Sequence, residues 1–220
     1  MTEQRSSKKI NELVREGVKF VNSDTVEIRG ELSCGANVLI ESNVIFEGKC
    51  NLAENVVIEP YVLIKNSNIK ENSRIKSFSS IEEAVIGENS FIGPQARIRP
   101  SSYIGKNCQI GNFVEVKDSK LGTGCRVNHM AFIGNAEIGD DVTIGAGVIT
   151  CNHDGVKNNK TIIKNGAYIG SNVNLIAPIT IHDKAVIGSG STVTKEVPAN
   201  KLTIARVKQK VIESWKGFNK

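Results

Sequence analysis

The sequence predicts an all-β fold, a parallel β-helix of about nine coils with a short N-terminal helix and an irregular C-terminal tail. Two observations predict it. Aliphatic residues recur every six positions, and glycine often follows them, as in IGENSF at 86–91 and IGKNCQ at 104–109. This period is not that of an α-helix, whose apolar spacing is near 3.6. Three such repeats make an 18-residue coil that buries its apolar side only against neighbouring coils.

The six-residue spacing also assigns the residues that point inward. The first run is Leu39, Ile45, Val57, Leu63, Ile69, Ile75 and Ile81, with Asn51 out of pattern. One-residue slips restart the count at Ile86, Leu121 and Ile138, and a last run extends from Ile163 to Val193. Glycine beside the inward residue suits a tight corner, where a side chain would clash or φ must be positive.

The two ends depart from the repeat and divide the chain. Ile10, Leu13, Val14 and Val18 have helical spacing after Ser6-Ser7, so residues 1–24 are predicted to be a helix or linker. The β-helix is expected over residues 25–206. The remaining segment, 207–220, breaks the repeat, and it either caps the last coil or lies near an active site.

The composition excludes several classes of function. The 220 residues are 40% hydrophobic but only 5% aromatic, so Ile and Val fill the core. Apolar runs are short, which excludes a membrane span, and the charged N-terminus lacks the apolar centre of a signal peptide. A net charge of +5 without a dense basic block does not indicate nucleic-acid binding.

The cysteines and histidines do not form a recognisable metal site. Cys34, Cys50, Cys108, Cys125 and Cys151 are odd in number and form no CxxC pair. Reduced, buried thiols in a cytoplasmic protein are therefore favoured over disulfides or zinc. The histidines at 129, 153 and 182 are widely spaced and contain no HxxxxH pair, so a carbonic anhydrase-like metal centre is not expected.

The repeat is interrupted most clearly at residues 150–162, TCNHDGVKNNKTI. Ile144 and the next regular inward residue, Ile163, are 163 − 144 = 19 residues apart. A polar loop that leaves a regular repeat favours a functional role over a tolerated insertion. His129 precedes this loop and lies near a slip in the repeat. A lone histidine more often has a structural role, but the position of His129 before this loop favours a functional one.

The coil length predicts which side chains stack. Arg99 and Lys117 are 117 − 99 = 18 residues apart and should lie about 5 Å from each other. Two stacked cations need an anion, either Glu115 or Asp118 or a substrate phosphate, and the residues leave these alternatives open. Ser171 and Ser189 are also 18 apart. Small residues stacked in this way form a shallow trough that could admit an extended ligand.

Several longer motifs resemble one family. They are ARIRP (96–100), GNFVEVK (111–117), HMAFIGNAEIGDDVTIGAGVITCNHDG (129–155), SNVNLIAPITI (171–181) and IARVKQ (204–209). They resemble the C-terminal domain of the bifunctional bacterial enzymes that join glucosamine-1-phosphate N-acetyltransferase to N-acetylglucosamine-1-phosphate uridyltransferase. The resemblance implies a left-handed β-helix, acetyl-CoA as co-substrate and a homotrimer with active sites between subunits. No LAAGxGTRM-like segment occurs, so uridyl transfer and its magnesium are not expected.

The resemblance also implies roles for individual residues. His129 would be the general base, and Arg99 and Lys117 would hold the sugar phosphate. Asn152 and the backbone at Ala146 would position the amine and the developing oxyanion. The residues expected to contact acetyl-CoA are Ser171, Ser189 and Arg206. No metal is expected to take part in acetyl transfer.

Three substrate positions depart from the family pattern. Phe132 stands where the family has Tyr, Thr143 replaces Asn, and Asn158 aligns with a phosphate-binding Lys, although Lys157 is adjacent. Losing a hydrogen bond to a charged group costs about 1.5–3 kcal/mol, so these changes weaken the expected site. Two alternatives therefore stand beside glucosamine 1-phosphate acetylation: transfer to a different amino sugar, and a non-catalytic scaffold.

Overall fold

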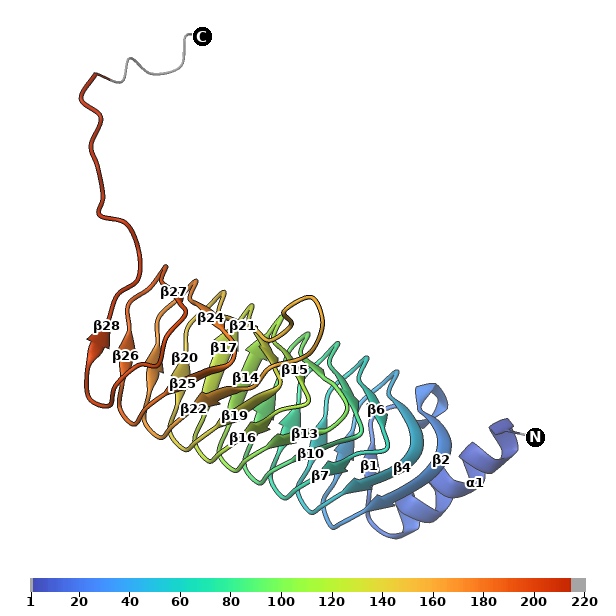
Figure 1. The fold of residues 1–220 in the computed structure, drawn as a ribbon. Coiled ribbons are helices and arrows are strands. Elements are labelled where there is room, and N and C mark those ends of the chain that lie inside the picture. Colours follow the sequence, from blue (N-terminus) through green and yellow to red (C-terminus); the bar gives the residue numbers. More distant parts are fainter. Residues whose placement is uncertain (1, 215–220) are drawn as a thin grey trace.

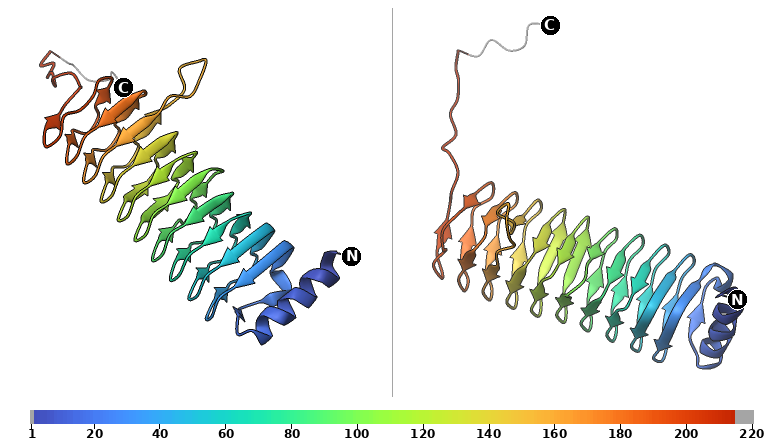
Figure 2. Two further views of the ribbon diagram at one scale, coloured as in Figure 1. Left: turned by 60° about the horizontal axis from the view of Figure 1, so that its bottom comes forward. Right: turned by 45° about the vertical axis from the view of Figure 1, so that its right-hand side comes forward.

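The computed structural model describes residues 2–214, with side chains from Lys8 onward. Over these residues the chain winds through about ten turns of a left-handed parallel β-helix (Figure 1). Three stacks of short parallel strands form the three faces of this helix, and the first and last described segments lie at opposite ends of it (Figure 2). The predicted all-β class is confirmed, with about ten turns where about nine were expected.

Face one is an eleven-stranded sheet whose strands are hydrogen-bonded in one uninterrupted order. Its strands are β1 (Lys19–Phe20), β3 (Leu39–Ile40), β5 (Val57–Ile58), β8 (Arg74–Ile75), β11 (Phe91–Ile92), β14 (Gln109–Asn112), β17 (Arg126–His129), β20 (Thr143–Ile144), β23 (Tyr168–Ile169), β26 (Val186–Ile187) and β28 (Leu202–Thr203).

Faces two and three share the long strands β2 (Glu27–Cys34) and β4 (Ile45–Leu52). Face two continues with β6 (Leu63–Lys65), β9 (Ser80–Glu82), β12 (Arg97–Ile98), β15 (Glu115–Lys117), β18 (Phe132–Gly134), β21 (Ile149–Cys151), β24 (Asn174–Ile176) and β27 (Thr192–Val193). Face three continues with β7 (Asn68–Ile69), β10 (Ala84–Ile86), β13 (Ser102–Ile104), β16 (Lys120–Leu121), β19 (Ala136–Ile138), β22 (Thr161–Ile163) and β25 (Ile179–Ile181).

Strand β4 shows why two faces share it. Its first half pairs Phe46 with Ile64 of β6, and its second half pairs Leu52 with Ile69 of β7. The strand therefore bends around a corner, and glycine permits the bend. A Cβ on Gly30 of β2 would lie 2.2 Å from the carbonyl oxygen of Gly48, which itself has a φ of +66°.

The core is a column of mostly aliphatic side chains, with an inward residue from each face of each turn and, in most turns, a second small buried residue two positions before it. In the first turns the inward strand residues include Ile40, Phe46, Leu52, Ile58 and Ile64. The residues predicted to point inward, Leu39, Ile45, Val57 and Leu63, are only half-buried, so the assignment before Ile69 was wrong by one position. Leu52 fills the position at which Asn51 broke the pattern. From Ile69 onward the residues predicted to point inward are buried, as Ile86, Leu121, Ile138 and Ile163 show.

The inward spacing shortens from six to five residues at one corner of the helix. The short steps join Ile64 to Ile69, Ile81 to Ile86, Val116 to Leu121 and Ile133 to Ile138. Each contains one residue with a φ of 45–49°: Asn66, Glu83, Asp118 and Asn135. These turns connect face two to face three, and we call their row the second edge. A coil that contains one short step has 17 residues.

The cysteines are unpaired, and three of them serve as small core residues. The thiols of Cys108 and Cys125 each lie 3.1 Å from a glycine carbonyl oxygen in the next turn, as the hydroxyl of Ser90 does at 2.9 Å. The neighbouring Cys108 and burial raise the pKa of Cys125. Burial likewise raises the pKa of Cys34 to about 12, so this thiol is protonated at neutral pH.

The helix α1 (Thr2–Arg15) covers the N-terminal end of the core (Figure 2). Ile10 and Leu13 are buried, whereas Val14 is half exposed. After the helix, Gly17 has a φ of +94°, and the N–H of Val18 donates to the carbonyl oxygen of Leu13 at 3.0 Å in a Schellman-type turn. A 3₁₀ turn, η1 (Ser23–Thr25), leads into β2. Within the described residues, no helix combines the length and apolarity needed to cross a membrane.

The C-terminal segment leaves the last turn instead of covering it (Figure 1). Residues 205–214 are exposed, and the side chain of Val207 is 95% exposed. The interpretation of this segment as a cap for the last coil is therefore wrong for its described part. Residues 215–220 lie outside the described residues.

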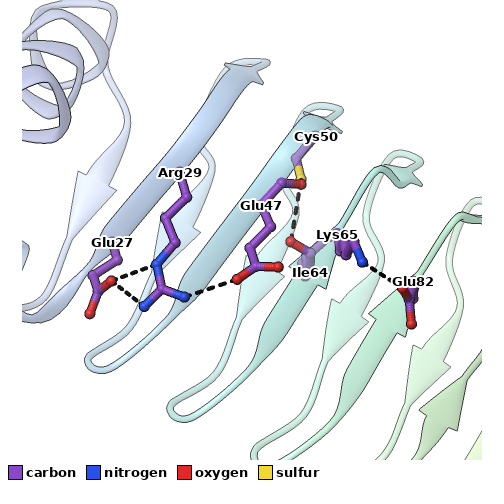
Figure 3. A network of polar contacts seen from close by, with 7 residues as sticks. All are labelled: Glu27, Arg29, Glu47, Cys50, Ile64, Lys65 and Glu82. Atoms are coloured by element: carbon purple, nitrogen blue, oxygen red, sulfur yellow. Dashed lines mark hydrogen bonds and ion pairs between the residues drawn. The ribbon is translucent and has the colours of Figure 1, made fainter. Parts of the chain in front are cut away.

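Outward side chains on face two form ion pairs, within a strand and between neighbouring turns (Figure 3). Arg29 lies between Glu27 and Glu47, with nitrogen–oxygen distances of 2.8 and 2.9 Å, and Lys65 lies 2.8 Å from Glu82. These contacts raise the pKa of Arg29 and lower that of Glu82. The pairs are exposed, so solvent screens them and they contribute little to stability.

Candidate active site

The turns that connect face one to face two form a second regular row, which we call the first edge. His129, Ala146, Ser171 and Ser189 occupy equivalent places in successive turns of this row. The backbone ladder fixes the order, because Gly147 donates to Met130, Asn172 to Ala146 and Gly190 to Ser171. Four residues predicted for catalysis or acetyl-CoA binding therefore lie along one edge.

His129 ends β17 and its side chain is exposed. Its Nδ1 lies 2.8 Å from Oδ1 of Asn112, its register partner on β14. An amide oxygen can only accept, so this contact places the imidazole proton on Nδ1. Nε2 then carries a lone pair, and no described residue binds it. His129 is therefore arranged as an acceptor of a proton from solution or from a ligand.

The serine stack predicted from the coil length is present. The N–H of Ser171 lies 3.2 Å from the hydroxyl oxygen of Ser189. Nη1 of Arg206 lies 3.0 Å from the carbonyl oxygen of Ser189 and extends the row by one turn. The N–H of Ala146, in the turn after His129, has no acceptor among the described residues. The first edge therefore combines a free base, a free backbone donor, small side chains and a cation.

Arg99 and Lys117 lie one turn apart at the end of face two, next to the second edge. The N–H of Arg99 donates to Val116 at 2.8 Å. Its guanidinium pairs with the Glu115 carboxylate at 2.8 Å, and both side chains are about one-third exposed, 32% and 31%. Glu115 is thus the anion that accompanies Arg99 in this structure. Lys117 forms no ion pair with any residue that the structure describes.

Phe132 and Asn152 both approach Gly134 on face two. A Cβ on Gly134 would lie 2.7 Å from two ring carbons of Phe132 and 3.3 Å from Nδ2 of Asn152. The ring therefore lies over the glycine backbone, beside the Asn152 amide. Phe132 has no hydroxyl to offer a ligand at this point.

The predicted loop leaves the β-helix between β21 and β22 (Figure 1). His153 and Asn158 form an antiparallel bridge across it. The Asp154 carboxylate accepts from the N–H groups of Lys157 and Val156 at 2.8 and 2.9 Å, and from Asn159 at 2.8 Å. These hydrogen bonds hold the pKa of Asp154 well below its usual range. The loop is thus ordered by its own contacts, with Lys157 exposed.

The structure does not bring all predicted site residues together within one chain. Gly134, the register partner of Lys117, follows His129 by five positions, so at about 3.3 Å per residue their backbones lie at most about 16 Å apart. Thr143 lies elsewhere, on face one, between Arg126 and Tyr168. The base and the phosphate-binding candidates therefore occupy opposite sides of face two.

Sequence reasoning missed two sets of partners. Asn112, which orients His129, lies 17 residues before it, because the coil between them contains a short step. Asp118 and Asn135 connect to Asn152 with the same 17-residue spacing. The slips of the repeat could have predicted these partners, because each slip shortens one coil from 18 to 17 residues.

The remaining histidines have structural contacts. Nε2 of His182 contacts Glu196, and Nδ1 of His153 accepts from Gly155 at 3.1 Å. Among the described residues, no three His, Cys, Asp or Glu side chains gather closely enough to hold a metal ion.

Comparison with known proteins agrees with this architecture. The family described as "Bacterial transferase hexapeptide (six repeats)" matches residues 83–118 and 160–195. The "Bifunctional protein GlmU" of Psychrobacter arcticus is 51% identical over 202 residues, which are 92% of this chain and 44% of that protein. That of Methylobacillus flagellatus is 45% identical over 93% of this chain and 44% of its own length.

A UDP-N-acetylglucosamine acyltransferase of Francisella novicida has a similar structure, with 20% identity and a TM-score of 0.49 over 86% of this chain and 66% of that one. The chain spans less than half the length of the curated relatives it matches. Their identity extends over nearly all of this chain, and the repeat geometry agrees with the matched family. The chain belongs to the hexapeptide-repeat transferases and is related to the GlmU proteins over the part of them that it matches.

Proposed function

We propose that this chain transfers the acetyl group of acetyl-CoA to the amine of glucosamine 1-phosphate, giving N-acetylglucosamine 1-phosphate and CoA. The first edge is the observation that carries this proposal. His129, with Nε2 free, lies one turn from the unpaired N–H of Ala146 and heads a row that ends at Arg206. The 51% identity to a GlmU protein supports the same reaction class.

The chemistry requires a base and an oxyanion donor. Nε2 of His129 would take a proton from the sugar ammonium, and the amine would attack the thioester carbonyl. The N–H of Ala146 would donate to the oxyanion that develops there. The N–C bond then forms as the C–S bond breaks, the new amide nitrogen loses its remaining extra proton to solvent, and the thiolate takes the proton from the imidazolium. No covalent acyl-enzyme is needed.

The two substrates would meet the two groups of candidate residues. Ser171 and Ser189 are small enough to leave room for an extended pantetheine arm, and Arg206 suits the phosphates of acetyl-CoA. The sugar phosphate would bind Arg99 and Lys117 beside Phe132, with Asn152, Lys157 and Asn158 from the loop and Thr143 from face one. Lys117 has no counterion among the described residues, which leaves its charge available to the phosphate.

We also propose that the active protein is a homotrimer whose sites lie between subunits. His129 and Lys117 lie on opposite sides of face two of one chain. An adjacent subunit can supply one of the two groups, and in a cyclic trimer each interface would then hold one site.

Exposed apolar side chains on the first edge support such an interface. Tyr61, Phe78, Phe113 and Met130 are 55–64% exposed, and the rings of Tyr61 and Phe78 stack with centroids 5.0 Å apart. All four have φ between 45° and 62°, a region in which bulky residues are uncommon. A row of exposed apolar residues is typical of an association surface.

Mixed trimers test the shared site. His129→Ala and Lys117→Ala chains, each inactive alone, are unfolded together and refolded. A site shared between subunits returns activity, because some interfaces then carry both wild-type side chains. If each site lay within one chain, the mixture would stay inactive.

The acceptor is tested by following CoA release with a panel of amino sugars. Glucosamine 1-phosphate should be required together with acetyl-CoA. A second candidate function, acetylation of another amino sugar, is favoured by Phe132 and by the Glu115 carboxylate that already pairs with Arg99. Turnover of a nucleotide-linked amino sugar but not of glucosamine 1-phosphate would establish it. The unpaired cysteines support a cytoplasmic location for either reaction.

A further inference from the structure

Three polar side chains form a hydrogen-bonded row along the second edge, beside the site proposed for the sugar. Asn135 Nδ2 donates to the Asp118 carboxylate, and Asn152 Nδ2 donates to Asn135 Oδ1 at 2.5 Å. The residues lie 17 positions apart in successive turns, and the N–H of Asn135 also donates to Lys117 at 3.1 Å. The row therefore connects an exposed carboxylate to Asn152 through one intervening amide.

The charge of Asp118 fixes which atoms donate and which accept along this row, and we call this order the direction of the row. An ionised carboxylate can only accept, so Asn135 must turn its amide nitrogen toward Asp118. The amide oxygen of Asn135 then faces Asn152 and requires a donor, which only Nδ2 of Asn152 can supply. Without the carboxylate, both amides could rotate by 180° and still form one hydrogen bond between them.

The direction decides which atom Asn152 can offer to a ligand. Its Nδ2 is engaged by Asn135 and also lies 3.5 Å from Oδ1 of Asn158. Its Oδ1 accepts no hydrogen bond from any residue that the structure describes. An oxygen suits an ammonium or amine, whereas a free amide nitrogen would suit a phosphate.

We propose that Asp118 is a positioning residue that acts through Asn135 to make Asn152 present its oxygen to the amino group of the acceptor. The inference rests on the proposed acetyl transfer, in which Asn152 contacts the amine. Asp118 itself touches no reacting atom. Its effect should therefore fall on the acceptor and not on acetyl-CoA.

The test variant is Asp118→Asn. Asn tolerates the φ of +45° at this position, so the turn keeps its conformation while the row loses its fixed direction. The matched control is Asp141→Asn, which removes an equal charge from an exposed position with a φ of +55° away from this row. The double variant Asp118→Asn, Asn135→Asp moves the carboxylate by one turn. The carboxylate introduced by Asn135→Asp can again accept from Asn152 and restores the original direction.

Steady-state kinetics distinguish this role from a general structural one. Asp118→Asn should lower kcat/KM for glucosamine 1-phosphate about tenfold, the order expected for one misdirected hydrogen bond, with KM for acetyl-CoA unchanged. The double variant should recover most of the loss, and Asp141→Asn should match the wild type. Inhibition by glucose 1-phosphate should be unaffected, because its hydroxyl both donates and accepts.

Neutron diffraction of deuterated crystals reads the amide orientation whether or not the acceptor is correct. In the wild type the deuterons of Asn152 should face Asn135, and Asp118→Asn should produce the reversed orientation or a mixture. Wild-type inactivity toward glucosamine 1-phosphate would overturn the proposed function without affecting this result. The inference on Asp118 is overturned if Asn152 keeps its orientation in Asp118→Asn, or if this variant behaves as Asp141→Asn does.

Discussion

Nδ1 of His129 lies 2.8 Å from Oδ1 of Asn112, one turn earlier along the first edge. The contact connects the repeat to the chemistry, because the parallel register between β14 and β17 sets the two side chains opposite each other. It also selects the tautomer in which Nε2 can accept a proton. The fold thus positions the proposed base with one neutral partner.

Replacing that partner should impair catalysis without preventing binding. Asn112→Ala removes the acceptor for Nδ1, so the imidazole populates both tautomers and more orientations. We expect kcat to fall about tenfold with KM for both substrates nearly unchanged, consistent with the loss of one hydrogen bond. Gln109→Ala is the control, since Gln109 is exposed on the same strand. Equal kcat values for the two variants would show that Asn112 does not orient the base.

Two departures from the family pattern can be reversed. Phe132→Tyr adds a hydroxyl beside Asn152, and Asn158→Lys adds a cation at the base of the loop. If the acceptor is glucosamine 1-phosphate, each change should lower its KM, by about tenfold for a hydrogen bond to a charged group worth at least about 1.4 kcal/mol. A rise in KM for this substrate in both variants would instead indicate a site adapted to another amino sugar.

Tight contacts between turns should dominate the effect of glycine substitutions. A Cβ on Gly105 would lie 2.3 Å from the carbonyl oxygen of Gly122 in the next turn. Gly105→Ala should therefore separate two turns and lower the free energy of unfolding by about 1–3 kcal/mol. Lys106→Ala, which removes only an exposed ion pair with Glu88, is the control and should change little. Thermal unfolding followed by circular dichroism measures both, and equal midpoints would contradict the expectation.

The loop at 150–162 should lose order at acidic pH. Hydrogen bonds from Lys157, Asn159 and Val156 lower the pKa of Asp154 in the folded state. Their stabilising effect is complete above the ordinary Asp pKa of about 3.9 and is lost as pH falls through the lower folded value. The amide shifts of Val156 and Lys157 should therefore titrate with a midpoint below about 3.9. A midpoint at or above that value would mean that the carboxylate does not hold the loop.

The sequence predicted the period of the fold but not its phase throughout. Leu39 and Ile40 are both aliphatic, as are Leu63 and Ile64, so spacing alone cannot tell which member of each pair points inward. In the structure, the member of each pair that points inward is the one preceded by another buried residue two positions earlier. Val38, for example, precedes Ile40. After Ile69 only one aliphatic residue fits each inward position in most turns, and there the predicted phase was correct.

The site was predictable where the coil has 18 residues and less so where it has 17. The 18-residue spacing correctly placed Ser171 beside Ser189 and Arg99 next to Lys117. A fixed coil length pairs His129 with Gly111 and therefore misses Asn112. The separation of His129 from Lys117 depends on which edge of the β-helix each residue lies at, and the period alone does not specify this.

The most direct test is acetyl transfer from acetyl-CoA to glucosamine 1-phosphate by the wild type and by His129→Ala. His153→Ala and His182→Ala serve as controls, because these histidines have contacts outside the first edge. The wild type should release CoA only when both substrates are present, His129→Ala should lose nearly all turnover while still binding acetyl-CoA, and the two controls should remain active. Wild-type protein that neither binds acetyl-CoA nor turns over, or a His129→Ala variant with unchanged turnover, would contradict the proposed base and its site.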